Sequence, residues 1–332
     1  MKRELVVVTG AGGFIGHHLV KRLKSEGKKV RGVDIKEPEY EPTAADDFEL
    51  LDLRRFDNCL QALRGAHCVY ALAANMGGIG FIESHKAEIM RDNALINLHT
   101  IEAARIHAAE RFLFTSSACV YPAGKQNTTN VVPLKEEDAY PADAEDGYGW
   151  EKLFMERHCR HYREDYGLET RVVRFHNIYG PLGTYDGGRE KSPAAICRKV
   201  ALVESGGEIE VWGDGQQTRS YCYIDDCVEG IRRLMDSDCP WPINLGTDRL
   251  VSVNELVRLV AEAAGKKVST RHDLTRPQGV RGRKSDNTLL RRTLRWEPTV
   301  TLEDGLRTTY HWIAGRVPSK ATIRELPLGT RA

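Results

Sequence analysis

Short apolar runs alternate with longer amphipathic stretches along the first half of the chain. The apolar runs have the length and the β-branched character of buried parallel strands, and they lie at 5–9, 29–34, 48–51, 68–72, 111–116 and 171–175. Apolar residues at helical spacing predict helices between them, notably at 17–26, 88–109 and 149–166. This order predicts an α/β fold, a Rossmann-type doubly wound parallel sheet.

The pattern changes after Gly180, where glycine and proline punctuate the chain as far as Pro193 and shorter elements follow. We therefore expect a smaller C-terminal α/β domain. The expected domains are 1–176, with a returning segment near 220–245, and 177–316. The tail at 317–332 has no clear periodicity, and we expect it to be mobile.

Composition places the 332-residue chain among globular proteins, with 41% hydrophobic and 29% charged residues. No apolar run approaches the ~20 residues that cross a bilayer, so we expect no membrane partner. Lys and Arg number 48 and Asp and Glu 47, a balance that argues against a general polyanion binder. The stretch 271–295 is locally basic. It is either a nucleic-acid patch or a diphosphate site, and the lack of a nucleic-acid-binding motif favours the second interpretation.

The eight cysteines form no CxxC pair and have no histidine at metal-ligand spacing, so we expect no metal site. The first residues lead directly into the strand at 5–9, so we expect no secretory leader. The simplest interpretation is a cytoplasmic protein whose thiols are reduced and mostly buried.

A glycine-rich loop follows the first strand. The loop contains Gly10, Gly13, Phe14, Ile15 and Gly16. Glycine allows a tight turn and a close approach of backbone to a pyrophosphate, and the following helix supplies free N–H groups. Asp34 ends the second strand, where an acid meets ribose hydroxyls and repels the 2′-phosphate of NADP. Strand, loop, helix, strand and acid in this order predict an NAD site.

Two further positions are candidates for cofactor contacts. Asp52 and Leu53 follow the third strand, where the carboxylate either meets the adenine edge or is a solvated loop acid. Ala71 and Ala73 lie at the end of the fourth strand. Small side chains there either let the chain pass beneath a dinucleotide or pack a helix on the sheet.

The end of the fifth strand has the composition of a reaction centre. Ser117 lies there, and ligands bind outside the carboxyl ends of parallel strands. Tyr148 and Lys152 follow at i, i+4 spacing, which places both on one helix face. The ammonium stabilises a phenolate, so we expect the pKa of Tyr148 to be lowered toward neutrality and the tyrosine to act as a base. Ser117 can hydrogen-bond the same substrate oxygen.

The glycine loop, Ser117 and the Tyr148–Lys152 pair together resemble the extended short-chain dehydrogenase/reductase family, whose members modify nucleotide sugars. Longer strings are similar to those of the GDP-mannose 3,5-epimerases within that family, at 75–81, 117–122, 174–181, 187–195, 212–220 and 279–287. The resemblance implies NAD in the Rossmann half and a GDP-sugar, GDP-mannose first, in the C-terminal half. It also implies a homodimer formed through the helices at 88–109 and 149–166.

The same resemblance implies residues that contact the substrate. It makes Cys119 and Lys191 the acid/base pair of an epimerase. Oxidation at C4 of the hexose acidifies the hydrogens at C3 and C5, and a thiol and an ammonium with pKa values near neutrality can remove and return them. The positions that it nominates for the diphosphate are Asn177, Lys199, Arg219 and Arg283. The other positions that it assigns to the substrate are Gly77, Ser117, Ala118, Glu190, Ser192, Gln217 and Thr218.

Three other interpretations stay open. A simple C4-epimerase requires neither Cys119 nor Lys191. A 4,6-dehydratase carries Asp-Glu after the serine position, where this chain has Ala118 and Cys119. An NAD(H)-sensing regulator often lacks the tyrosine or the lysine, and both are present here. Asn75 and Tyr185 depart from the epimerase strings, which puts the exact sugar in question and not the reaction class.

Overall fold

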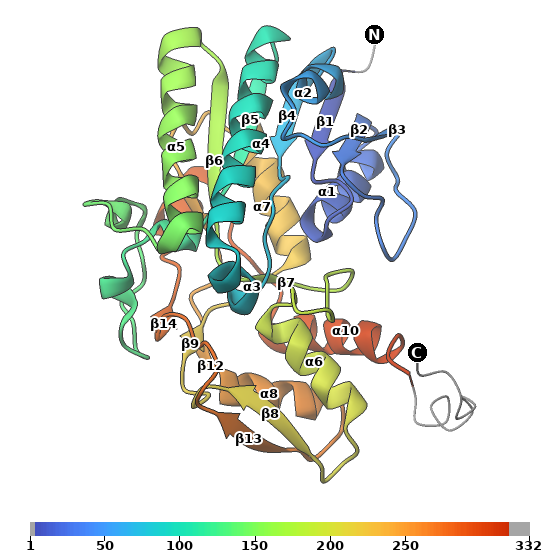
Figure 1. Ribbon diagram of the computed structural model, residues 1–332, viewed down its shortest axis with the longest axis vertical. Coiled ribbons are helices and arrows are strands. Elements are labelled where there is room, and N and C mark those ends of the chain that lie inside the picture. The colour runs from blue at the N-terminus through green and yellow to red at the C-terminus, as the bar shows by residue number, and fades with distance from the viewer. Residues whose placement is uncertain (1–3, 319–332) are drawn as a thin grey trace.

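Residues 4–318, which the computed structural model describes, fold around a seven-stranded sheet (Figure 1). Its strands are β1 (Leu5–Thr9), β2 (Lys29–Asp34), β3 (Asp47–Leu50), β4 (Ala66–Ala71), β5 (Arg111–Ser117), β6 (Glu169–Phe175) and β11 (Ile243–Leu245). Every pair in the sheet is parallel, and the spatial order is β11-β6-β5-β4-β1-β2-β3. The predicted Rossmann-type fold is confirmed, and the carboxyl ends of the strands meet at one edge of the sheet.

Helices cover both faces of this sheet. They are α1 (Phe14–Ser25) and α7 (Ile224–Asp236) on one face, and α2 (Phe56–Ala62), α4 (Lys86–Ile106) and α5 (Asp146–Tyr166) on the other. Along β1, Val6 and Val8 share an apolar cluster with Leu19 of α1, whereas Val7 shares another with Ile101 of α4. Because successive side chains of a strand point to opposite faces, β1 is buried on both sides. This burial explains its uninterrupted apolar sequence.

A smaller lobe follows β6, in the lower part of Figure 1. Three of its helices pack on one another: α6 (Ser192–Leu202), α8 (Val253–Ala263) and α10 (Leu302–Ala314). The short strands after β6 are β7 (Ile178–Tyr179), β8 (Glu208–Trp212), β9 (Thr218–Arg219), β10 (Cys222–Tyr223), β12 (Val251–Ser252), β13 (Ser269–Asp273) and β14 (Gly282–Arg283). They pair as β7 with β10, β8 with β13, and β9 with both β12 and β14. The remaining short helices are α3 (Ile79–Ser84), α9 (Thr288–Leu294), η1 (Ala118–Val120), η2 (Ala123–Gln126) and η3 (Glu136–Ala139).

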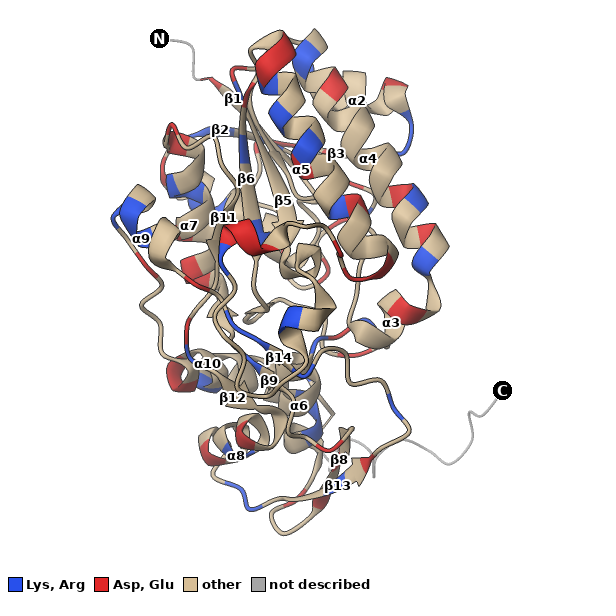
Figure 2. Ribbon diagram, turned by 90° about the vertical axis from the view of Figure 1, so that its left-hand side faces the viewer, with Lys and Arg blue, Asp and Glu red and all other residues tan. Residues whose placement is uncertain are grey.

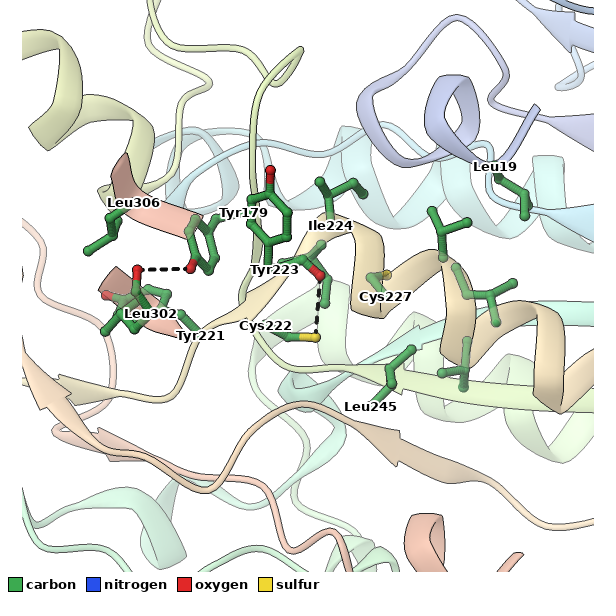
Figure 3. Packing of buried hydrophobic residues seen from close by; sticks show 14 of the residues in the cluster. Leu19, Tyr179, Tyr221, Cys222, Tyr223, Ile224, Cys227, Leu245, Leu302 and Leu306 are labelled. Carbon is green, nitrogen blue, oxygen red and sulfur yellow. Dashed lines mark hydrogen bonds between the residues drawn. The ribbon is translucent and has the colours of Figure 1, made fainter. Parts of the chain in front are cut away.

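The two lobes meet in a buried cluster of aromatic and aliphatic side chains (Figure 3). The rings of Tyr179 and Tyr223 meet edge to face with their centres 5.6 Å apart. The Tyr179 hydroxyl donates a hydrogen bond to the Leu302 carbonyl at 3.3 Å. Cys227, on α7, is also buried in this cluster. After the junction, the chain returns to the seven-stranded sheet through α7 and β11.

The observed boundaries agree with the predictions more closely in the sheet than in the helices. All six predicted strands are present, with ends within two residues of those expected. Helix α5 begins at Asp146, earlier than expected, which places Tyr148 in its first turn. Residues 319–332 of the expected tail lie outside the described residues, and no helix within 4–318 is long and apolar enough to cross a membrane.

Candidate active site

The glycine-rich loop joins β1 to α1 at the carboxyl edge of the sheet. Gly10 has a φ of 71°, and a Cβ on Gly16 would lie 2.1 Å from the Gly10 carbonyl oxygen, so the loop excludes side chains at both positions. Gly13 is the N-cap of α1, and Phe14 and Ile15 form the first helical turn. The N–H groups of this turn therefore face a cradle without side chains, which fits the pyrophosphate of NAD.

Asp34 ends β2 beside this loop. Its carboxylate accepts hydrogen bonds from the backbone N–H of Gly12 at 2.9 Å and of Ile35 at 2.7 Å. Burial raises the pKa of this carboxyl, and the backbone donors oppose the shift. A half-buried carboxylate next to the loop is a suitable acceptor for ribose hydroxyls, so the loop and the acid together fit NAD.

The other predicted cofactor residues have different surroundings. Asp52 accepts three hydrogen bonds from the guanidinium of Arg54, the shortest with Nη2 2.8 Å from Oδ2, and Leu53 is buried. The Asp52 carboxylate is therefore already an ion-pair partner. Ala73 lies against the glycine loop, since its N–H donates to Thr9 Oγ1 at 3.2 Å, and Ala71 is buried at the end of β4.

Ser117, Tyr148 and Lys152 come together where β5 meets α5. The Lys152 Nζ lies 5.7 Å from the centre of the Tyr148 ring and 4.8 Å from the centre of the Phe114 ring. Both Tyr148 and Lys152 are buried. The i, i+4 spacing thus puts the two side chains on one helix face.

The pKa of Tyr148 is shifted in the direction opposite to the one expected. Burial raises the pKa of the phenol, and the nearby Cys119 and Glu151 raise it further. A hydrogen bond with Ser117 opposes this shift. The expected lowering toward neutrality is therefore wrong for this structure, because desolvation of the phenolate is the largest influence.

Cys119 lies two residues past Ser117, in the turn η1. Its N–H donates to Ser117 Oγ at 3.2 Å, and its carbonyl accepts the N–H of Glu145 at 2.8 Å. Its sulfur accepts an N–H of Arg283, with Nη1 at 3.6 Å. Burial raises the pKa of the Cys119 thiol, Arg283 lowers it and Glu145 raises it. The net rise contradicts the expected shift toward neutrality, since desolvation of the thiolate again dominates.

Gly149 connects this cysteine to the tyrosine. It follows Tyr148 directly, and a Cβ at Gly149 would lie 2.2 Å from the Cys119 carbonyl oxygen. Only a residue without a side chain allows the first turn of α5 to approach η1 this closely.

Lys191 reaches the same region from the smaller lobe. It is the N-cap residue of α6. Burial lowers the pKa of its ammonium, as expected, and the neighbouring Cys119 sulfur opposes the shift. The positive charge of Arg283 favours the shift. The sulfur of Cys119 thus favours the charged form of Lys191 across the boundary between the lobes.

Arg219 and Arg283 lie opposite each other on the parallel strands β9 and β14. Burial opposes the charge of Arg283, but its ion pair with Glu145 outweighs burial and raises its pKa. Within residues 4–318, Arg219 donates only to the backbone carbonyls of Thr218 and Gln278. Burial, together with the charge of Arg283, lowers the pKa of Arg219 to about 10. Of these two arginines, Arg219 is therefore the one available to an anionic ligand.

The loops that carry Gly77, Glu190 and Ser192 pack together. The N–H of Gly78 donates to the Arg189 carbonyl at 3.0 Å, which brings the first loop onto the second. Glu190 accepts the N–H of Gly188 at 2.7 Å, and Ser192 Oγ lies 3.0 Å from the Tyr221 hydroxyl.

The other predicted substrate residues are mostly bonded to backbone. Asn177 donates to the Ser220 carbonyl at 2.8 Å, Gln217 to the Trp212 carbonyl at 3.0 Å, and Thr218 to the Thr129 carbonyl at 2.6 Å. Lys199 donates to the Glu210 carbonyl on β8 at 2.8 Å. The structure thus directs Lys199 toward β8, where its charged neighbours are Glu210, Glu190, Arg198 and Arg276.

Two polar residues beside Cys119 were missed by sequence reasoning. Gln126 is buried, accepts the N–H of Arg283 Nε at 2.7 Å and donates to Glu145 at 2.8 Å. Glu145 in turn pairs with Arg283. Glu145 stands three residues before Tyr148, at the N-cap of α5, and this position was a usable signal. Gln126 lies in a polar stretch that follows no pattern.

Within residues 4–318, no group of three or more His, Cys, Asp or Glu residues could hold a metal ion. All eight cysteines are free thiols.

Comparison with known proteins first gives the class. Residues 6–246 match the model of the NAD dependent epimerase/dehydratase family, so the chain belongs to this enzyme family and NAD is its cofactor. The fold is shared with UDP-glucose 4-epimerase of Thermotoga maritima with UDP-glucose, at a TM-score of 0.85 and 27% identity over 94% of this chain and 99% of that one. It is also shared with the Thermus thermophilus UDP-glucose 4-epimerase complex with NAD, at a TM-score of 0.82 and 25% identity over 94% of this chain and 100% of that one.

Sequence relatives narrow this class. The chain is 50% identical over 319 residues to GDP-mannose 3,5-epimerase 1 of Oryza sativa subsp. japonica, covering 96% of this chain and 83% of the relative. It is 50% identical over 314 residues to GDP-mannose 3,5-epimerase of Arabidopsis thaliana, covering 94% and 82%. The resemblance to this branch of the family is confirmed.

Proposed function

We propose that this protein converts GDP-mannose to GDP-L-galactose, and to GDP-L-gulose, by epimerising the hexose at C5 and C3. The observation that carries the proposal is a thiol and an ammonium, Cys119 and Lys191, beside the Tyr148–Lys152 pair. A tyrosine and a lysine suffice for chemistry at C4, whereas the second pair adds a route for protons at neighbouring carbons. The 50% identity to GDP-mannose 3,5-epimerases supports the same substrate.

Tyr148 is the proposed base at C4. Its phenolate oxygen takes the proton of the C4 hydroxyl, and Ser117 hydrogen-bonds the same substrate oxygen. The ammonium of Lys152, 5.7 Å from the centre of the Tyr148 ring, favours the phenolate that this step needs. Ser117 and Arg283 oppose the effect of burial on the pKa of Tyr148. The glycine-rich loop and Asp34 would hold NAD, which would supply a reversible hydride acceptor for C4.

Cys119 and Lys191 are the proposed proton carriers at C5 and C3. The C4 ketone acidifies both C–H groups because the carbanion delocalises into an enolate. Burial favours the uncharged form of each carrier, since it raises the pKa of the thiol and lowers that of the ammonium. A neutral thiol can donate a proton and a neutral amine can accept one, so the pair can exchange protons with opposite faces of the ring.

The diphosphate is assigned to Arg219 and to Asn177, which donates to the carbonyl of the next residue, Ser220. A guanidinium without a carboxylate partner within residues 4–318 supports this assignment, and charge-assisted hydrogen bonds to phosphate are the strong ones. In this arrangement residues 1–176 hold NAD, and residues 177–316 hold mainly the nucleotide sugar.

A homodimer through α4 and α5 is part of the proposal. These helices pack side by side at the surface (Figures 1 and 2). Large apolar side chains are exposed on both of them, namely Met90, Leu95, Trp150 and Phe154, and an exposed apolar patch marks an interface. We expect Phe154→Lys to shift the mass measured by analytical ultracentrifugation from dimer to monomer. The eight free thiols support a cytoplasmic location.

Incubation with GDP-mannose in deuterated water tests the reaction. We expect deuterium at C5, and at C3 in the doubly epimerised product, without added NAD, as measured by NMR and mass spectrometry. Cys119→Ser should abolish this exchange while NAD stays bound. If the wild-type protein puts no deuterium into either carbon, the proposal is wrong for this substrate.

A further inference from the structure

Gln126, Glu145 and Arg283 form a hydrogen-bonded triad that joins three separate parts of the chain. Gln126 accepts from Arg283 Nε at 2.7 Å and donates to Glu145 Oε1 at 2.8 Å, and Glu145 closes the triad by pairing with Arg283 Nη2. The side chain of Arg283 is 9% exposed and that of Glu145 is 20% exposed, so water competes little for these bonds.

The triad leaves one nitrogen of Arg283 for Cys119. A guanidinium is a planar fork, so fixing two of its nitrogens fixes the third. Here Nε and Nη2 are held by Gln126 and Glu145, and Nη1 lies 3.6 Å from the Cys119 sulfur. Glu145 also holds the cysteine backbone, since its N–H donates to the Cys119 carbonyl at 2.8 Å.

We propose that Glu145, supported by Gln126, is a positioning residue that aims the guanidinium of Arg283 at the sulfur of Cys119. This assignment rests on the proposed function in one respect, that Cys119 is the thiol that carries protons. The Glu145 carboxylate would then have two effects. It orients the Arg283 guanidinium toward the Cys119 sulfur, and its negative charge offsets part of the positive charge of that guanidinium.

The charges around the sulfur determine what each substitution does. The charged or titratable groups that act on Cys119 or are acted on by it are Arg283, Glu145, Tyr148, Lys191 and Arg219. Glu145 is the carboxylate among them, and it raises the pKa of the thiol while Arg283 lowers it. Glu145→Gln keeps a side chain of the same length that still accepts from Arg283 but removes the negative charge. Glu145→Ala removes both.

Alkylation of Cys119 by iodoacetamide across a pH series tests the charge effect. The NAD-loaded enzyme is used, and the Cys119 peptide is quantified by mass spectrometry. For Glu145→Gln we expect the midpoint of the rate profile to move to lower pH by about half a unit or more, because a carboxylate near the thiolate is lost. Asp143→Asn is the matched control, since Asp143 is exposed in the same loop, and its profile should match the wild type.

Deuterium exchange at C5 of GDP-mannose tests the orienting effect. Glu145→Ala should lose tenfold or more of the exchange rate, whereas Glu145→Gln should keep most of it, and transient C4 oxidation should be unchanged in both. A purely structural role predicts no shift of the alkylation midpoint in Glu145→Gln. That result, or wild-type exchange in Glu145→Ala, overturns the assignment.

Two further results distinguish a failure of the positioning role of Glu145 from a failure of the proposed function. If Glu145→Ala does not fold, Gln126→Ala should show the slower exchange instead, and wild-type exchange in that variant overturns the assignment. The alkylation profile needs no sugar. A shifted midpoint in Glu145→Gln therefore supports the triad even if the wild-type enzyme leaves GDP-mannose unlabelled, a result that contradicts only the proposed substrate.

Discussion

The two sides of the proposed site are built in different ways. On the sheet side, Ser117 ends β5 and Tyr148 and Lys152 lie on α5, so one strand–helix unit places all three. On the side of the smaller lobe, Lys191 caps a helix and Arg219 lies on a two-residue strand. Regular secondary structure fixes the first group, and contacts between loops fix the second. Oxidation at C4 is thus assigned to the rigid side, and substrate recognition mostly to the adaptable one.

Arg219 and Arg283 differ from each other in a similar way. The resemblance gave Arg219 and Arg283 one role at the diphosphate, and they lie opposite each other in the strand register. Their surroundings nevertheless differ, since Arg283 is neutralised by Glu145 and Arg219 bonds only backbone within residues 4–318. Position on a strand therefore does not decide the role of a charged residue, and the identity of its partner does.

Tyr148→Phe gives the largest expected effect, because the sheet side acts first. Without the hydroxyl, no base removes the C4 proton, and turnover should fall toward the upper end of the about 10²–10⁴-fold range of acid–base catalysis. The measurement is NADH absorbance in a single turnover. NAD should stay bound, since the ring still packs in place. Transient NADH at the wild-type level would contradict the role of Tyr148.

Lys191→Met should separate the two sides of the site. C4 oxidation should persist, while exchange at C5 falls by about 10²–10³-fold because one of the two proton carriers is lost. Rapid-quench mass spectrometry, which follows the 4-keto sugar and the deuterium content together, checks this. Parallel loss of both signals would show that the lobe side also positions the substrate for oxidation.

Arg219→Gln should act mainly on binding. Loss of a charge-assisted hydrogen bond to phosphate costs about 10–100-fold in affinity, so KM for the GDP-sugar should rise by that factor with kcat nearly unchanged. Steady-state kinetics over a substrate series measures both constants. An equal fall in kcat would place Arg219 with the reacting groups and remove the distinction between the two arginines.

We expect the stability of the fold to depend on pH through a buried histidine, His176, between the two sides of the site. His176 follows β6 and bonds Asn244 of β11 at 3.0 Å, and burial lowers its pKa to about 3. In the unfolded chain the imidazole of His176 takes up a proton near pH 6.5, whereas in the folded chain it stays neutral. The contribution of His176 to the free energy of unfolding is therefore complete above pH 6.5 and falls by up to ~1.4 kcal/mol per pH unit below it. Urea unfolding between pH 4 and 7 measures this loss.

A non-titrating residue checks the origin of that loss. His176→Gln should flatten the pH dependence between 4 and 6.5, whereas His85→Gln, at an exposed position, should not. An unchanged slope in His176→Gln would assign the acid sensitivity to other groups.

The sequence alone predicted the sheet side better than the lobe side. The strands around β1 carry uninterrupted apolar runs, and Tyr148 and Lys152 carry a helical spacing, so local pattern and fold agree there. Arg219 and Arg283 were found through resemblance, and Lys199 was placed with them although it bonds the Glu210 carbonyl. Periodicity cannot show which backbone group a lysine meets across a turn.

The direction of the two pKa shifts could not be predicted for a related reason. We expected the ammonium of Lys152 to lower the pKa of Tyr148 toward neutrality, and the resemblance implied a Cys119 thiol with a pKa near neutrality. Both pKa values are raised instead, because burial of the anionic form outweighs the influence of nearby cations. Burial depends on how η1 and α5 pack. The position of Glu145 at the N-cap of α5 was a usable signal, whereas Gln126 lies in a stretch without a motif.

The contact between Gly149 and the Cys119 carbonyl has a consequence for how this enzyme can change over generations. Tyr148 precedes that glycine directly, so any shift that re-aims the tyrosine pushes on the backbone of the cysteine. The residue proposed to oxidise C4 and the residue proposed to carry protons are thus coupled through one backbone contact. Substitutions around Lys191 and Arg219, on the side of the smaller lobe, can therefore change sugar recognition more freely than substitutions at Tyr148 or Cys119, because each of those two residues constrains the other.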